Sequence, residues 1–214
     1  MEKLEKIIDE EKSHNISYIV IGCNQEGYLD SCFSSIKTQN PAPFEIIYVD
    51  SSTDNSMKIA RKYTPHVYFV EKKGPNPARN YGASKAKGDF LVFIDGNDEL
   101  DPDAAKEINK AINEGIRVGP LSWATKIFSL REMLIDAVLN QFNYKGWYSC
   151  FVEKSLFEKV GGFEENIEGA DDLATIGFAL KGISPSKRIK ARVYVNKDPF
   201  YKQGFVRRLF EWLK

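Results

Sequence analysis

Short apolar runs rich in β-branched residues alternate with segments of helical periodicity in the first half of the chain. The apolar runs predict strands, and the intervening segments, with apolar positions three or four residues apart, predict helices. Run 90–94 is apolar at every position, as expected of a strand buried on both faces. We therefore predict an α/β fold with a mostly parallel central sheet and helices on both faces, with strands over 18–21, 44–49, 67–70 and 90–94 and helices over 29–36, 54–63 and 77–87.

The second half of the chain is less regular. Ser129–Glu132 and Ser155–Glu158 match the capping-box pattern that opens helices, and alternating apolar residues over 189–195 predict a half-buried strand. No linker divides the sequence, so we expect one domain over 1–214. Helices are predicted over 103–113, from Ser129 onward, over 171–181 and, with an apolar stripe on one face, over 204–214.

Composition narrows the function classes. Lys plus Arg (30) equals Asp plus Glu (30), so there is no general attraction to nucleic acid, and none is expected as a partner. Three widely spaced cysteines predict neither a disulfide framework nor a zinc site, and reduced thiols are typical of the cytoplasm. The charged first residues do not resemble a signal peptide, and no run of about 18 apolar residues occurs. We expect a cytoplasmic protein.

Acidic and amide side chains follow three of the predicted strands. These segments are Gly22–Glu26, Asp50–Asp54 and Asp95–Asp98. In open parallel sheets, ligands bind beyond the carboxyl ends of the strands, so the three segments can converge on one crevice. Acidic groups hold a phosphate only through a divalent cation, and Mg²⁺ or Mn²⁺ prefers such oxygen ligands. The alternative is that these side chains only cap helices and close turns.

From about Ser17 to about Gly182 the sequence resembles family 2 glycosyltransferases, which have the GT-A fold. The resemblance rests on five segments in the family's order: Tyr18–Leu29 as first strand and nucleotide loop, Tyr48–Asp54 as second nucleotide loop, Pro77–Gly82 as the Ala-Arg-Asn-x-Gly segment, Phe93–Asp98 as the metal-binding DxD segment, and Val160–Glu165 as the Gly-Gly-Phe-Asp-Glu element. It implies a nucleotide-binding half over about 15–100 and an acceptor half over about 101–198.

The resemblance implies an inverting, metal-assisted transfer from a UDP- or GDP-linked sugar to a glycan or lipid-linked acceptor. The implied donor-binding residues are Gly22, Asn24, Glu26, Asp50, Arg79 and Asp95, with Asp50 accepting a hydrogen bond from the base. Arg79 binds the diphosphate or is a structural partner of an acidic loop. A divalent cation, Mn²⁺ or Mg²⁺, is expected on Asp95 with Asn97 or Asp98. Spacing to Gly182 places Asp171 at the position of the general base; helix capping is the alternative for Asp171 and its neighbour Asp172.

Three departures from the family pattern bear on activity. Asn97 stands at the second acidic position of the DxD segment, Ala170 stands where a Glu is expected, and region 193–198 lacks the family's usual His. They support a second hypothesis, a catalytically weak or inactive sugar-nucleotide-binding module. A Rossmann dehydrogenase and a nucleotidyltransferase are disfavoured, since no glycine-rich phosphate loop follows the first strand. The basic, amphipathic segment 204–214 can contact the inner membrane face or pack on protein.

Overall fold

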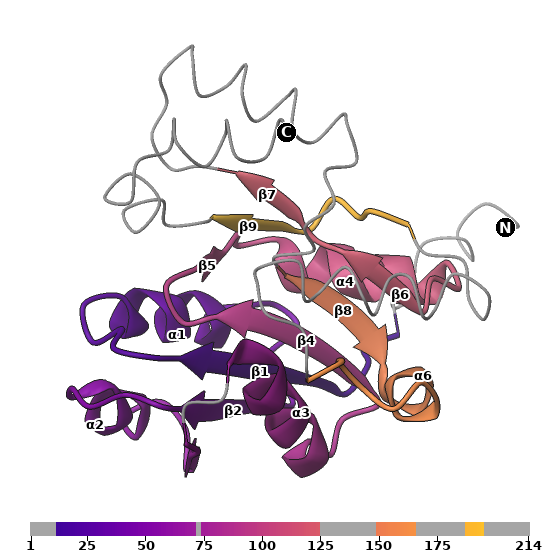
Figure 1. Cartoon of the computed structure of the whole chain (residues 1–214). Coiled ribbons are helices and arrows are strands. Elements are labelled where there is room, and N and C mark those ends of the chain that lie inside the picture. Colours follow the sequence, from indigo (N-terminus) through magenta and orange to yellow (C-terminus); the bar gives the residue numbers. More distant parts are fainter. Residues whose placement is uncertain (1–11, 72–73, 125–148, 166–186, 195–214) are drawn as a thin grey trace, which may run out of the picture.

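The computed structural model describes residues 12–71, 74–124, 149–165 and 187–194 (Figure 1). Its main feature is a six-stranded sheet with the strand order β3-β2-β1-β4-β8-β6. Neighbours among the first four strands run parallel, whereas β8 is antiparallel to both β4 and β6. The strands are β1 (Ile16–Gly22), β2 (Glu45–Asp50), β3 (His66–Phe69), β4 (Phe90–Asp95), β6 (Val118–Pro120) and β8 (Cys150–Glu153). This arrangement confirms the predicted mostly parallel sheet.

Helices cover both faces of this sheet, as predicted, and each face has its own cluster of buried apolar side chains. One cluster joins the sheet to α1 (Leu29–Lys37), α2 (Ser56–Ala60) and α4 (Ala104–Asn113). The other joins it to α3 (Pro75–Lys85) and α6 (Lys154–Lys159). The apolar face of each helix therefore packs against a strand face, which is the physical origin of the layered architecture.

Strand β4 lies at the centre and contributes to both clusters. Val92 and Ile94 pack on the α1 side, and Leu91 and Phe93 pack on the α3 side. Helix α3 approaches the sheet closely, since a Cβ built on Gly82 would lie 2.5 Å from Cγ2 of Ile19. That close approach brings the polar side chains near the start of α3 toward the carboxyl end of β4.

A second sheet has three short strands in the order β5-β9-β7 (Figure 1). They are β5 (Glu99–Leu100), β7 (Ser122–Ala124) and β9 (Arg192–Tyr194). The half-buried strand predicted over 189–195 is thus shorter than expected, although its alternation is confirmed: Val193 is buried and Arg192 is exposed. Strand β5 directly follows the segment after β4, so the second sheet begins at the carboxyl edge of the first.

The predicted helix boundaries need correction, most clearly at α6 and α2. Helix α6 begins at Lys154, and the Ser155 hydroxyl donates to the Glu153 carboxylate, so Ser155 does not cap the helix as predicted. Helix α2 ends at Ala60, so Tyr63 lies beyond it. Tyr63 still packs on the core through a stacked ring contact with Phe33, with centroids 5.2 Å apart. The aromatic residue at position 63 is therefore accounted for by its packing on the core and not by a place in the helix.

Three predicted helices lie outside the described residues: the one from Ser129, 171–181 and 204–214. Within the part of the chain that is described, no helix is long and apolar enough to cross a membrane.

Candidate functional site

The sheet has a topological switch point between β1 and β4. From β1 the chain moves outward through β2 and β3, and then returns to place β4 on the other side of β1 (Figure 1). In open α/β sheets ligands bind in the crevice outside the carboxyl ends of strands at such a point. The segment after β4 contacts β1 directly, because the N–H of Gly96 donates to the carbonyl of Ile21 at 2.8 Å. The three polar segments predicted from the sequence therefore meet at this edge.

The segments after β1 and β2 are joined by reciprocal hydrogen bonds. Asn24 has a positive φ of 55°, and its Oδ1 accepts from the backbone N–H of Thr53 at 2.9 Å. Oε2 of Glu26 accepts from both the backbone and the side-chain N–H groups of Asn55, each at 3.0 Å. In return, the N–H of Glu26 donates to Asp54 at 3.2 Å. The predicted donor-binding residues Asn24 and Glu26 thus hold two loops together.

Asp54 completes this loop pair. Partial burial acts to raise its pKa, but hydrogen bonds from Ser56 and from the N–H of Glu26 outweigh that effect and lower the pKa. Its Oδ1 accepts from the backbone N–H of Ser56, the first residue of α2, at 2.9 Å. Asp54 lies one residue before Asn55, the N-cap residue of α2, so it does not cap the helix as predicted. Its carboxylate instead closes the turn before the helix and stays ionised as it bridges both loops.

Asp50 is fully buried at the end of β2. Its Oδ1 accepts from the Tyr48 hydroxyl at 2.8 Å and from the Ser52 hydroxyl at 2.5 Å, while Oδ2 has no hydrogen-bond partner among the described residues. The pKa of Tyr48 is raised, first by burial and second by the hydrogen bond to Asp50. Gly22 makes room for this network, since a Cβ there would collide with the Tyr48 hydroxyl.

Asp95 forms an ion pair with Arg79 of α3. Nη2 of Arg79 lies 3.0 Å from Oδ1 of Asp95; the Arg79 side chain is 6% exposed and that of Asp95 is 33% exposed. Nη1 of Arg79 donates to Oδ1 of Asn76 at 3.2 Å. Of the two roles predicted for Arg79, the structure shows the structural one. The pair holds the Asp95 carboxylate at the carboxyl edge of β4.

The residues after Asp95 form a turn in which the N–H of Asp98 donates to the Asp95 carbonyl at 2.9 Å. Oδ1 of Asn97 accepts from Nε2 of Gln25 at 3.3 Å, a bond that spans the switch point. Asp95 and Asn97 are half-buried, whereas Asp98 is only 2% exposed. Asp95 and Asn97 are therefore the more accessible polar side chains of this turn.

This turn fits a divalent cation only in part. The described residues contain no group of three or more His, Cys, Asp or Glu side chains that could hold a metal. Mg²⁺, however, is usually held by one or two carboxylates together with substrate phosphates and water. One carboxylate at Asp95 and one amide oxygen at Asn97 match that donor set. They fit a cation that binds together with a diphosphate.

The local electrostatics agree with this donor set. The pKa of the Cys32 thiol, buried beneath the turn, is raised first by burial and then by the negative charges of Asp98, Glu99 and Asp95. A concentration of negative charge at the end of β4 attracts a cation and repels a bare phosphate.

The structure thus brings together all described residues of the predicted site. Asp171 lies outside the described residues. Sequence reasoning missed two contributors, Gln25, which bridges to Asn97, and Asn76, which orients Arg79. Gln25 lies within the quoted nucleotide-loop segment, and Asn76 is one helical turn from Arg79, so i, i+3 spacing was the signal available for it.

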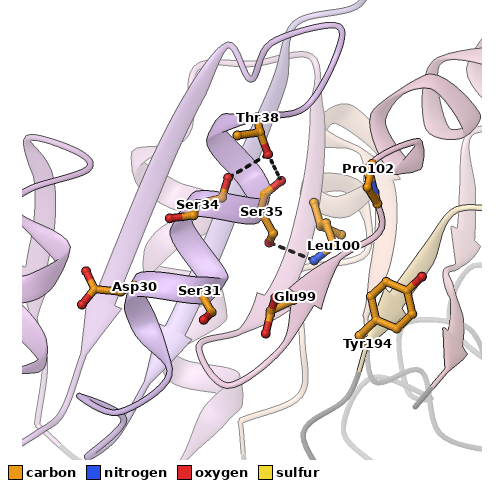
Figure 2. Close-up of a pocket in the computed structure, with 9 residues that line it drawn as sticks. All are labelled: Asp30, Ser31, Ser34, Ser35, Thr38, Glu99, Leu100, Pro102 and Tyr194. Atoms are coloured by element: carbon orange, nitrogen blue, oxygen red, sulfur yellow. Dashed lines mark hydrogen bonds between the residues drawn. The ribbon is translucent and has the colours of Figure 1, made fainter. Parts of the chain in front are cut away.

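A separate open groove lies between α1, β5 and the end of β9 (Figure 2). It has a volume of about 560 Å³ and includes none of the predicted donor-binding or metal residues. Two of its hydroxyls serve the backbone: Ser35 accepts from the N–H of Leu100 at 2.9 Å, and Thr38 donates to the carbonyl of Ser34 at 2.9 Å. The groove is therefore distinct from the site at the switch point.

The model of the family described as Glycosyl transferase family 2 matches residues 17–128, more than half of the chain. The chain therefore belongs to family 2 of the glycosyltransferases. It is 30% identical over 158 residues to EpsH of Bacillus subtilis, covering 71% of this chain and 45% of EpsH. It is 32% identical over 108 residues to the Campylobacter jejuni GalNAc(5)-diNAcBac-PP-undecaprenol beta-1,3-glucosyltransferase, covering 47% of this chain and 35% of that protein.

Solved structures confirm the GT-A fold expected from the resemblance. S. aureus TarS superposes with a TM-score of 0.67 at 21% identity, over 88% of this chain and 38% of TarS. The mannosyltransferase PcManGT from Pyrobaculum calidifontis, solved with GDP-Man and Mn²⁺, gives a TM-score of 0.67 at 17% identity, over 90% of this chain and 60% of that protein. A structure of TarS 1-349 contains UDP-GlcNAc. The chain spans less than two-thirds of the length of these proteins.

The three free cysteines offer a test of where the donor binds. Cys23 is half-buried on the loop after β1, with Sγ 3.7 Å from the Ser51 carbonyl. Cys32 and Cys150 are fully buried, and burial raises the pKa of Cys150 to about 12. Because thiolates are the reactive form, a thiol reagent at about pH 8 should label the folded protein at Cys23. Mass spectrometry should show slower labelling with UDP-GlcNAc and Mn²⁺, and an unchanged rate with bound donor would place the donor elsewhere.

Proposed function

We propose that this protein transfers a sugar from a UDP- or GDP-linked donor to an acceptor hydroxyl with inversion at the anomeric carbon. The observation that carries the proposal is the half-exposed Asp95 carboxylate, held by Arg79 at the switch point where three polar loops meet. Structurally similar proteins have been solved with UDP-GlcNAc and with GDP-Man plus Mn²⁺, which supports a nucleotide-sugar donor. In this proposal residues 15–100 hold the donor and residues 101–198 hold the acceptor.

In the donor site, the loops after β1 and β2 enclose the nucleoside. Their shape is maintained by Asn24 and Glu26, whose side chains link the two loops. Asp50 offers the base a carboxylate oxygen that lacks a protein partner among the described residues, provided that the buried Tyr48–Asp50 pair opens on binding. A buried acceptor without a hydrogen bond costs free energy, so a base N–H that reaches it stabilises the complex.

Asp95 and Asn97 would hold the divalent cation, Mn²⁺ or Mg²⁺, together with the donor diphosphate. Such a cation acts as a Lewis acid that offsets the charge of the departing diphosphate. Arg79 keeps the Asp95 side chain oriented for this role. The side-chain amide of Asn97 would supply a neutral oxygen ligand to the cation.

Asp171 is the proposed general base. It takes the proton from the acceptor hydroxyl, whose oxygen forms a bond to the anomeric carbon as the bond from that carbon to the diphosphate oxygen breaks. The new bond forms on the face opposite the leaving group, so the configuration inverts. A positioned carboxylate contributes about 10²- to 10⁴-fold to such a step.

The acceptor in this proposal is a glycan or a lipid-linked sugar, and the protein is cytoplasmic. The name of the Campylobacter jejuni relative includes undecaprenol, which supports a lipid-linked acceptor. Residues 204–214 would contact the anionic inner face of the membrane peripherally, with packing on the domain or on another subunit as the alternative. Asn97 and Ala170 favour a second candidate, a module that binds sugar nucleotides and turns them over weakly or not at all.

Thermal unfolding with a panel of nucleotide sugars tests the donor and the cation together. UDP- or GDP-linked sugars should raise the melting temperature only when Mn²⁺ or Mg²⁺ is present, because the negative edge of the sheet repels a bare diphosphate. A ligand present at 100 times its dissociation constant adds about 2.7 kcal/mol to the free energy of unfolding. Equal stabilisation in EDTA would exclude the cation role, and measuring donor hydrolysis beside binding separates the enzyme from the inactive module.

A further inference from the structure

Three polar side chains near the start of α3 share one face of the helix. Asn76, Arg79 and Asn80 are spaced i, i+3 and i+4, which brings them together. Arg79 binds Asp95 at the donor site, whereas the two asparagines bind the turn at 162–165 that follows α6. One helical turn therefore contacts two segments that are far apart in the sequence.

Asn80 makes three hydrogen bonds with that turn. Its Nδ2 donates to the carbonyl of Phe163 at 2.9 Å and to Oε1 of Glu165 at 2.8 Å. Its Oδ1 accepts from the backbone N–H of Phe163 at 2.9 Å. The amide thus pairs with both backbone groups of one residue, and Asn76 adds a bond to the carbonyl of Glu164 at 2.7 Å. No other common side chain of this length carries both the donors and the acceptor that this pairing needs.

The turn is shaped to receive Asn80. Gly162 has a φ of 81°, and a Cβ on it would lie 2.7 Å from Oδ1 of Asn80. Phe163 is 2% exposed and packs edge-on against Phe93 of β4, with centroids 4.9 Å apart. The guanidinium of Arg79 lies over the Phe163 ring at 5.8 Å. The turn is therefore fixed to both α3 and the strand that ends in Asp95.

We propose that Asn80 is a positioning residue, which sets the turn at 162–165 relative to the Asp95 side of the donor site. The inference rests on the proposed function, in which the segment following this turn carries Asp171. Asn80 touches neither the donor nor the acceptor in this role. Its loss changes where the turn lies and leaves the strand-end loops that bind the nucleotide intact.

The test compares Asn80→Ala with Asn109→Ala in the full chain. Asn109 is a matched control, because its buried amide also joins a helix to a distant backbone N–H, that of His14, but on the opposite face of the sheet. Hydrogen exchange should speed up about tenfold or more at the Phe163 amide in Asn80→Ala, with β1 and β4 unchanged. Where a donor is turned over, kcat should fall about 10- to 100-fold while KM for that donor stays within about twofold.

Each result decides the proposal. If the exchange rate of the Phe163 amide is unchanged in Asn80→Ala, the proposal is wrong. It is also wrong if Asn80→Ala lowers kcat no more than Asn109→Ala does, or if KM for the donor rises as much as kcat falls. Asn80→Asp keeps the acceptor for the Phe163 N–H but places a carboxylate oxygen against the Phe163 carbonyl and the Glu165 carboxylate, so it should lower kcat at least as much as Asn80→Ala. A wild-type protein that turns over no nucleotide sugar defeats the proposed function instead, and exchange at Phe163 then decides whether Asn80 holds the turn.

Discussion

Asp171→Asn is expected to lower the turnover number by about 100-fold or more, with little change in donor affinity. The substitution keeps the size and shape of the side chain but removes its ability to accept a proton. The acceptor hydroxyl is a poor nucleophile until a base takes its proton, so the chemical step slows. Donor affinity should stay the same because the strand-end loops hold the nucleotide in the proposed site. Steady-state kinetics and donor titration on the same preparation measure both quantities.

Asp172→Asn is the matched control for this prediction. In the predicted helix over 171–181, consecutive residues point about 100° apart, so Asp172 cannot occupy the place of Asp171. Its substitution should be far milder. Loss of turnover in Asp172→Asn with normal turnover in Asp171→Asn would shift the assignment by one residue. If neither substitution affects turnover, the general base must be sought elsewhere or the protein is the non-catalytic module.

Asp95→Ala is expected to have two separable effects. It removes the carboxylate proposed to bind the cation, so the metal-dependent thermal shift with a nucleotide sugar should disappear. It also leaves the guanidinium of Arg79 buried without its partner, and breaking a buried pair in this way costs about 3–5 kcal/mol. Since the Asp95 side chain is one-third exposed, we expect a loss at or below the lower end, about 2–3 kcal/mol. Urea unfolding without ligand measures this second effect.

The double variant Asp95→Ala/Arg79→Met separates stability from binding. Removing both charges should recover part of the unfolding free energy, because no unpaired charge remains buried. It should not restore the metal-dependent thermal shift. Recovery of that shift in the double variant would show that Asp95 acts only as the partner of Arg79, and the cation would then require other ligands.

The core of the fold could be predicted because its strands are apolar on both faces. Such a run, as at 90–94, is buried only in a sheet covered on both sides, and the clusters around Val92 and Phe93 confirm this. The short strands were missed for the opposite reason. Strand β8 (Cys150–Glu153) has four residues and runs directly into α6, so too few residues remain to establish a period of two. Its antiparallel place beside β4 depends on tertiary packing alone.

The sequence by itself determined the layered α/β core, the polar character of the three strand ends and the place of Asp95 and Asn97 directly after the central apolar strand, because these depend on local composition and period. Only the tertiary structure decided which partner each polar side chain takes. Glu26 binds Asn55, Arg79 binds Asp95, and Asn80 binds the turn at 162–165. A side chain with hydrogen-bonding capacity can satisfy it with protein, ligand or water, and the choice depends on which groups the strand order brings within about 3 Å.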